Sequence, residues 1–79
     1  MPEILLFTKK DCVRCPKIKE LMRDRKIPFK EFDVETPDGL AELAFLGKDI
    51  RTVPILRWHN GEVVTDLIEI LKKIDRWPE

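Results

Sequence analysis

The strongest chemical signal in this chain of 79 residues is a pair of cysteines, Cys12 and Cys15, with two residues between them. They follow an apolar run and precede apolar residues at helical spacing, so Cys12 is predicted to lie at a helix start. The first N–H groups of a helix have no intrahelical partner and carry partial positive charge, which favours a thiolate. We therefore expect Cys12 to attack disulfides and Cys15 to resolve the mixed disulfide that results.

The charge distribution adds to this expectation. The chain has no net charge, with 15 Lys and Arg against 15 Asp and Glu, but residues 1–30 hold nine of the cations and only four of the acids. Lys9 and Arg14 flank the cysteines and favour the thiolate of Cys12, whereas Asp11 opposes it. A pI of about 6.6, with no basic run interleaved with aromatic residues, argues against a nucleic-acid partner.

Three other uses of the cysteine pair compete with redox chemistry. A structural disulfide would close a loop too short to constrain much of the unfolded chain. Structural zinc takes four ligands, but the chain offers a single histidine, His59, and no further cysteine. A carrier of Cu(I) is the main alternative, because two thiolates can hold this soft ion. Small copper carriers typically place Met two residues before the first cysteine, where this chain has Lys10.

Hydropathy, helix capping and turn signals predict seven elements. The four predicted strands are Glu3–Thr8, Phe29–Val34, Val53–Trp58 and Glu62–Thr65, and the three predicted helices are Val13–Lys26, Thr36–Gly47 and Asp66–Arg76. Thr36-Pro37-Asp38 is a helix start, and Asp66 and Glu69 are spaced like a capping pair. Asn60-Gly61 between strands indicates a tight hairpin.

This element order, β-α-β-α-β-β-α, predicts an α/β fold over residues 1–79 as one domain. The first β-α-β unit gives a parallel pair with a right-handed crossover, and the hairpin adds two antiparallel strands. The result is a four-stranded mixed sheet flanked by three helices, with helices on both faces. No apolar run approaches the roughly 20 residues of a membrane span, and no signal-peptide core is visible, so we expect a cytoplasmic location and no membrane partner.

The cysteine motif after the first strand, combined with Thr52-Val53-Pro54 before a later strand, resembles the thioredoxin-like superfamily and, within it, the glutaredoxin branch. The resemblance spans roughly residues 3 to 75. It implies a thioredoxin fold and a dithiol–disulfide oxidoreductase that takes part in electron transport and cell redox homeostasis. It also implies that Pro54 is a cis-proline that shapes the substrate groove, with the backbone of Val53 offered to a bound substrate chain or to glutathione.

The same resemblance suggests further ligand contacts. Lys9 matches a basic residue that meets a glutathione carboxylate in this family, and Thr65 and Asp66 lie where a ligand with an anion and an amine could meet a helix start. Glutaredoxins usually carry C-P-Y-C and a Gly-Gly pair after the hairpin. This chain has Val13-Arg14 between the cysteines and no such pair, which argues against glutathione as the electron donor. Glutathione is nevertheless one of two candidate donors.

A C-V-x-C centre is also similar to the small redoxins that serve ribonucleotide reductase and take electrons from a thioredoxin-reductase-like flavoenzyme. That flavoenzyme is the second candidate donor. Disulfide-containing proteins are the expected substrates, with ribonucleotide reductase among the candidates. Because electrons would pass through the thiols themselves, no bound cofactor or metal is expected, and the chain is expected to be a monomer.

Overall fold

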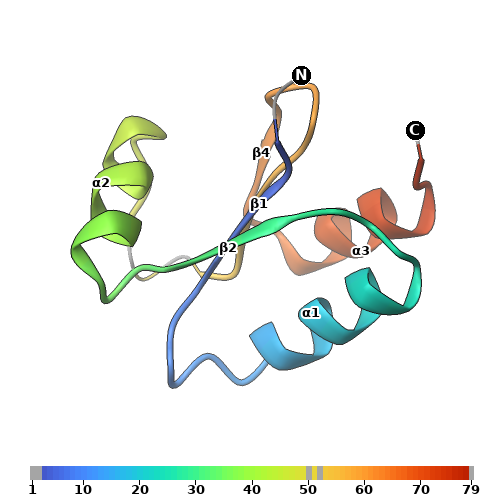
Figure 1. Ribbon diagram of the computed structural model, residues 1–79, viewed down its shortest axis with the longest axis horizontal. Coiled ribbons are helices and arrows are strands. Elements are labelled where there is room, and N and C mark those ends of the chain that lie inside the picture. The colour runs from blue at the N-terminus through green and yellow to red at the C-terminus, as the bar shows by residue number, and fades with distance from the viewer. Residues whose placement is uncertain (1–2, 50, 52, 79) are drawn as a thin grey trace.

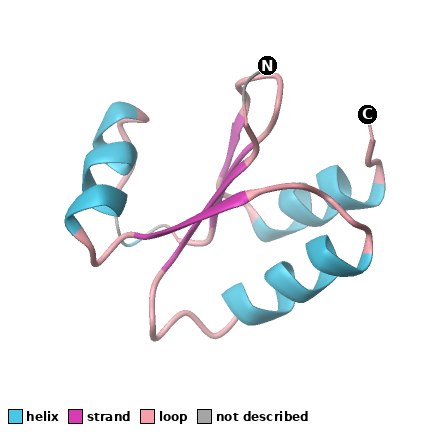
Figure 2. Ribbon diagram, viewed as in Figure 1, coloured by secondary structure: helices cyan, strands magenta, loops and turns pink. Residues whose placement is uncertain are grey.

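The computed structural model of the chain describes residues 3–49, 51 and 53–78. Its elements follow the predicted order (Figures 1 and 2), and each is shorter than predicted by one or two residues at one or both ends. The strands are β1 (Leu5–Thr8), β2 (Lys30–Asp33), β3 (Ile55–Arg57) and β4 (Val63–Val64), and the helices are α1 (Cys15–Asp24), α2 (Pro37–Phe45) and α3 (Leu67–Asp75).

The four strands form one mixed sheet in the order β2-β1-β3-β4. β1 runs parallel to β2, which α1 connects to it, and antiparallel to β3, with Phe7 opposite Ile55. β3 and β4 form the antiparallel hairpin, with Leu56 opposite Val64. The predicted α/β fold with a four-stranded mixed sheet and three helices is therefore confirmed.

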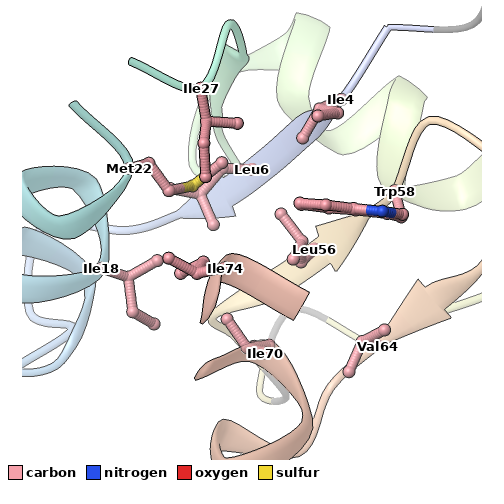
Figure 3. Close-up of a cluster of buried hydrophobic side chains, with 10 residues drawn as sticks. All are labelled: Ile4, Leu6, Ile18, Met22, Ile27, Leu56, Trp58, Val64, Ile70 and Ile74. Carbon is pink, nitrogen blue, oxygen red and sulfur yellow. The ribbon is translucent and has the colours of Figure 1, made fainter. Parts of the chain in front are cut away.

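The central strand β1 is buried on both faces, as its unbroken apolar sequence predicts. Successive side chains of a strand point to opposite faces, so Leu6 packs toward α1 and α3 while Phe7 packs toward α2. Figure 1 shows α1 and α3 together on one face of the sheet and α2 on the other. The larger cluster, drawn in Figure 3, consists of Ile4, Leu6, Ile18, Met22, Ile27, Leu56, Trp58, Val64, Ile70 and Ile74.

α1 begins at Cys15, two residues later than predicted. Pro16 lacks an N–H and fits only the first turn of a helix, so the helix starts immediately before it. The helix ends earlier than predicted because Lys26 adopts a left-handed conformation with φ 57°. The N–H of Ile27 then bonds the carbonyl of Met22 at 2.9 Å, which closes the helix end and directs Ile27 into the core.

The predicted starts of α2 and α3 are present. The Thr36 hydroxyl accepts from the N–H of Gly39 at 3.1 Å, and the Asp66 carboxylate accepts from the N–H of Ile68 at 3.2 Å. Glu69, predicted to pair with Asp66 in capping, instead lies 3.5 Å from the ammonium of Lys72, one turn later.

α2 lies very close to the end of β2. A Cβ at Gly39 would lie 2.5 Å from the carbonyl carbon of Asp33 and 3.1 Å from Cα of Val34. Gly39 and Leu43 are the buried residues of this helix, whereas Leu40, predicted on the same apolar face, is 48% exposed. Of the helices in the described part of the chain, none has the length and apolar character needed to cross a membrane.

Candidate active site at the cysteine pair

Cys12 and Cys15 are joined by a disulfide, with their Cα atoms 5.5 Å apart. The two residues differ in exposure. Cys15 is the first residue of α1 and only 2% exposed, whereas Cys12 lies in the preceding loop and is partly exposed. A molecule that approaches from solvent therefore meets the sulfur of Cys12 first.

The loop that carries Cys12 is held at two points. The N–H of Cys12 bonds the carbonyl of Lys9 at 3.1 Å and closes a turn directly after β1. The N–H of Lys10 bonds the carboxylate of Glu35 at 3.2 Å, which ties the loop to the connection between β2 and α2. These contacts hold the loop that carries Cys12 at the end of β1.

The sulfur of Cys12 lies at the N-terminus of α1, as predicted. The N–H of Cys15 points at the Cys12 Sγ, 3.1 Å away. The N-cap residue, Arg14, makes no side-chain cap, and the first turn of α1 contains no acidic residue. The Cys12 sulfur therefore accepts the first N–H of a helix that has no side-chain cap, and this helix end favours negative charge.

The sheet register brings Pro54 to the same end of the molecule. Phe7 lies opposite Ile55 in an antiparallel pair, so Pro54, which directly precedes β3, lies at the end of β1 from which the cysteine loop leaves. The Val53–Pro54 peptide bond is cis, as the resemblance implies, and Pro54 is buried. Thr52, predicted beside it as a site residue, lies outside the described residues.

The predicted residues Thr65 and Asp66 also reach this end. α1 and α3 lie side by side, and an ion pair of 3.0 Å between Arg25 and Asp75 joins their C-terminal ends. Ile18 and Ile70, each in the first half of its helix, also belong to one buried cluster, so α3 starts on the same side of the molecule as α1, with Asp66 as its N-cap. Both Thr65 and Asp66 are exposed there.

Lys9 and Arg14 frame the cysteines in different ways. The ammonium of Lys9 lies 3.6 Å from the carboxylate of Asp11, so part of its charge is offset by the acid predicted to oppose it. Arg14 is exposed and forms no ion pair with any residue that the structure describes.

A polar network that the sequence did not predict lies close to the cysteine loop. The Thr8 hydroxyl, on a residue 4% exposed, donates to the Glu31 carboxylate at 2.7 Å, and the ammonium of Lys19 lies 3.2 Å from the same oxygen. The network joins β1, β2 and α1 next to the cysteine loop. Thr8 could have indicated this network, because it is a polar residue at the end of an otherwise apolar strand that is buried on both faces.

Comparisons with known proteins agree with this geometry. The model of the Glutaredoxin family matches residues 4–64. N-acetyl-S-hydroxy-L-cysteine reductase from Bacillus subtilis (strain 168) is 25% identical over 67 residues, which cover 85% of this chain and 72% of that protein.

Two similar solved structures are of the thioredoxin-like protein BC3987 and of a mutant of it. The first has a TM-score of 0.72 at 27% identity and covers 91% of this chain and 99% of that one. The mutant has a TM-score of 0.75 at 25% identity and covers 94% of this chain and 100% of that one. With its disulfide at the start of α1 and a family match over most of its length, this chain, a thiol redox protein with a thioredoxin-like fold, belongs to the glutaredoxin family.

Proposed function

We propose that this protein is a dithiol–disulfide oxidoreductase that reduces protein disulfides, with Cys12 as nucleophile and Cys15 as resolving thiol. The main observation behind the proposal is that the two cysteines differ in their exposure to solvent. Cys12 is accessible and receives the N–H of Cys15 at 3.1 Å, whereas Cys15 is 2% exposed. Membership of the glutaredoxin family supports the same assignment.

The reaction takes two exchange steps. In the reduced protein the Cys12 thiolate attacks one sulfur of the target disulfide. A Cys12–target disulfide bond forms and the target's own S–S bond breaks. The target's other sulfur leaves as a thiolate and takes up a proton. Cys15 then gives up its proton and attacks the Cys12 Sγ. The Cys12–Cys15 disulfide forms, the target's second thiol is released, and two electrons have moved from protein to target.

The surrounding residues bind the target in this proposal. Pro54 and the backbone of Val53 form one side of the substrate groove, because the register places them beside the end of β1. Arg14 and Lys9 keep positive charge near the Cys12 sulfur, and Thr65 and Asp66 offer polar groups at the start of α3. Either glutathione or a thioredoxin-reductase-like flavoenzyme returns the two electrons, and re-reduction of the oxidised protein by each donor separately distinguishes them.

A second candidate function is reduction of a cysteine sulfenic acid. The relative from Bacillus subtilis is named for reduction of N-acetyl-S-hydroxy-L-cysteine, which carries this group. The nucleophile is again the Cys12 thiolate, which attacks the sulfur of R–S–OH. A Cys12–S–R bond forms and the S–O bond breaks. The hydroxide that leaves is protonated to water. Cys15 then resolves the mixed disulfide and releases R–SH.

Single substitutions at the two cysteines test the proposal. Cys12→Ser is expected to abolish reduction of a protein disulfide, because the attacking atom is lost. Cys15→Ser is expected to accumulate a mixed disulfide of one protein and one target molecule, detected by mass spectrometry under non-reducing conditions. Circular dichroism of both variants controls for folding. Turnover by Cys12→Ser, or a trapped adduct on Cys15 in that variant, would reverse or overturn the assigned roles.

A further inference from the structure

Three cations close to the cysteine pair in the sequence have no ion-pair partner in the described part of the chain. Lys10, Arg14 and Lys17, which we call the cationic rim, are all exposed, and none of them forms an ion pair with a described residue. Lys10 and Arg14 lie on either side of Cys12 in the loop, and Lys17 lies in the first turn of α1, two residues after Cys15. Their charge is therefore open to a molecule that approaches the sulfur.

The acids at this end of the molecule are directed elsewhere. Asp11 lies against Lys9, which is not part of the rim. Glu35 accepts from the backbone N–H of Lys10, and Asp66 accepts from the N–H of Ile68 at the start of α3. Because no described carboxylate forms an ion pair with Lys10, Arg14 or Lys17, the side chains of the cationic rim are available to carboxylates of a partner.

An apolar side chain lies within the rim. Val13, between Cys12 and Arg14 in the sequence, is 91% exposed. A side chain this exposed contributes nothing to the core, but it lies next to the sulfur that the proposed reaction joins to the target. An exposed apolar residue therefore lies in the same loop as Lys10 and Arg14, between them in the sequence.

We propose that the preferred substrates are protein or peptide disulfides flanked by acidic residues, with an apolar residue beside the attacked cysteine. This inference rests on the proposed function and specifies its substrate class. The target's carboxylates would face the cationic rim while its apolar residue covers Val13. Complementary charge of this kind speeds encounter and orients the partner, and it weakens as salt is added.

The test uses pre-reduced protein in single-turnover reactions with two synthetic peptides. Both carry the same intramolecular disulfide and the same apolar residue, and they differ only in flanking Asp and Glu against flanking Lys. The readout is the ratio of their second-order rate constants, in which any change in the reactivity of the Cys12 thiol cancels. At low salt we expect the acidic peptide to react about tenfold faster, and the ratio to fall toward one in about 1 M salt.

Charge reversal at two residues of the cationic rim tests whether this surface causes the preference for the acidic peptide. Lys10→Glu with Lys17→Glu should lower the acidic-to-basic ratio about tenfold at low salt. The matched control is Arg23→Glu with Arg76→Glu, which changes net charge equally on exposed residues at the C-terminal ends of α1 and α3. This control should keep the wild-type ratio. Lys10→Gln with Lys17→Gln, a milder change, provides a second variant and should give an intermediate ratio.

The outcomes separate the inference from the function on which it rests. If wild-type protein reduces both peptides at equal rates, or if the control variant lowers the ratio as much as the rim variant does, the inference is overturned and the proposed function stands. If wild-type protein reduces neither peptide, the proposed function fails and the inference fails with it.

Discussion

Replacing Cys15 with serine leaves Cys12 as a lone thiol but keeps the backbone N–H that lies 3.1 Å from its sulfur. We expect the folded variant to hold the pKa of the Cys12 thiol below its ordinary value, because the uncapped start of α1 stabilises the thiolate. A helix end stabilises a partly buried charge by about 1–2 kcal/mol. Since 1.36 kcal/mol corresponds to a factor of ten, the ratio of thiolate to thiol at a given pH should rise about 5- to 30-fold.

The assay is the rate of alkylation by iodoacetamide as a function of pH, measured on the folded variant and on the same variant in denaturant. The unfolded chain supplies the matched reference, because it keeps the sequence around Cys12 and loses the helix. The folded protein should reach half of its maximal rate at a lower pH than the unfolded chain. Equal midpoints, or a higher midpoint when folded, would refute the assignment of the helix end as the activating group.

The lower pKa of the Cys12 thiol in the folded state should also affect the stability of Cys15→Ser. A thiol whose pKa is lower in the folded state contributes its full stabilisation above the unfolded pKa and loses it as the pH falls through the folded pKa. Cys15→Ser should therefore become more stable relative to Cys12→Ser/Cys15→Ser as the pH rises through this window. Thermal unfolding of both variants, kept free of oxidant, measures the difference, and a constant difference across the window would contradict the shift.

Gly39→Ala should lower the free energy of unfolding by about 2 kcal/mol and Tm by roughly 10 °C, because the new Cβ meets the carbonyl group of Asp33; the higher Tm usual for an exposed helical glycine would contradict this. The 2.6 Å contact with Lys73 holds the pKa of Glu62 below its ordinary value. The stabilisation from this exposed pair is therefore present at neutral pH and lost as the pH falls through the folded pKa of Glu62. The difference in Tm between wild type and Lys73→Met should shrink on acidification, and a difference that grew instead would argue against the pair.

The parts of the fold that depend on local patterns could be predicted from the sequence. The unbroken apolar run of β1 indicated a strand buried on both faces, and the hydroxyl of Thr36 and carboxylate of Asp66 indicated two helix starts. Residue order and hydropathy are enough for such features because each depends on neighbours within a few positions. The position of Cys12 at a helix N-terminus was predictable for the same reason.

Features that depend on the meeting of distant segments were not predictable from the residues alone. The contact of Glu35 with the N–H of Lys10 joins positions 25 residues apart, and the Thr8–Glu31 bond joins positions 23 apart. For neither pair do the neighbouring residues in the sequence indicate the contact. The cis bond before Pro54 was expected through the family resemblance, because an X-Pro bond in a sequence is usually trans.

The sulfur that we propose to react follows an interior strand of the sheet. β1 is hydrogen-bonded on both sides and packed on both faces, and it ends at Thr8, four residues before Cys12. Amide hydrogens along β1 should exchange only when the whole domain opens, while those of the loop just beyond it exchange through small local movements. Small movements of the cysteine loop therefore leave its anchor in the sheet in place.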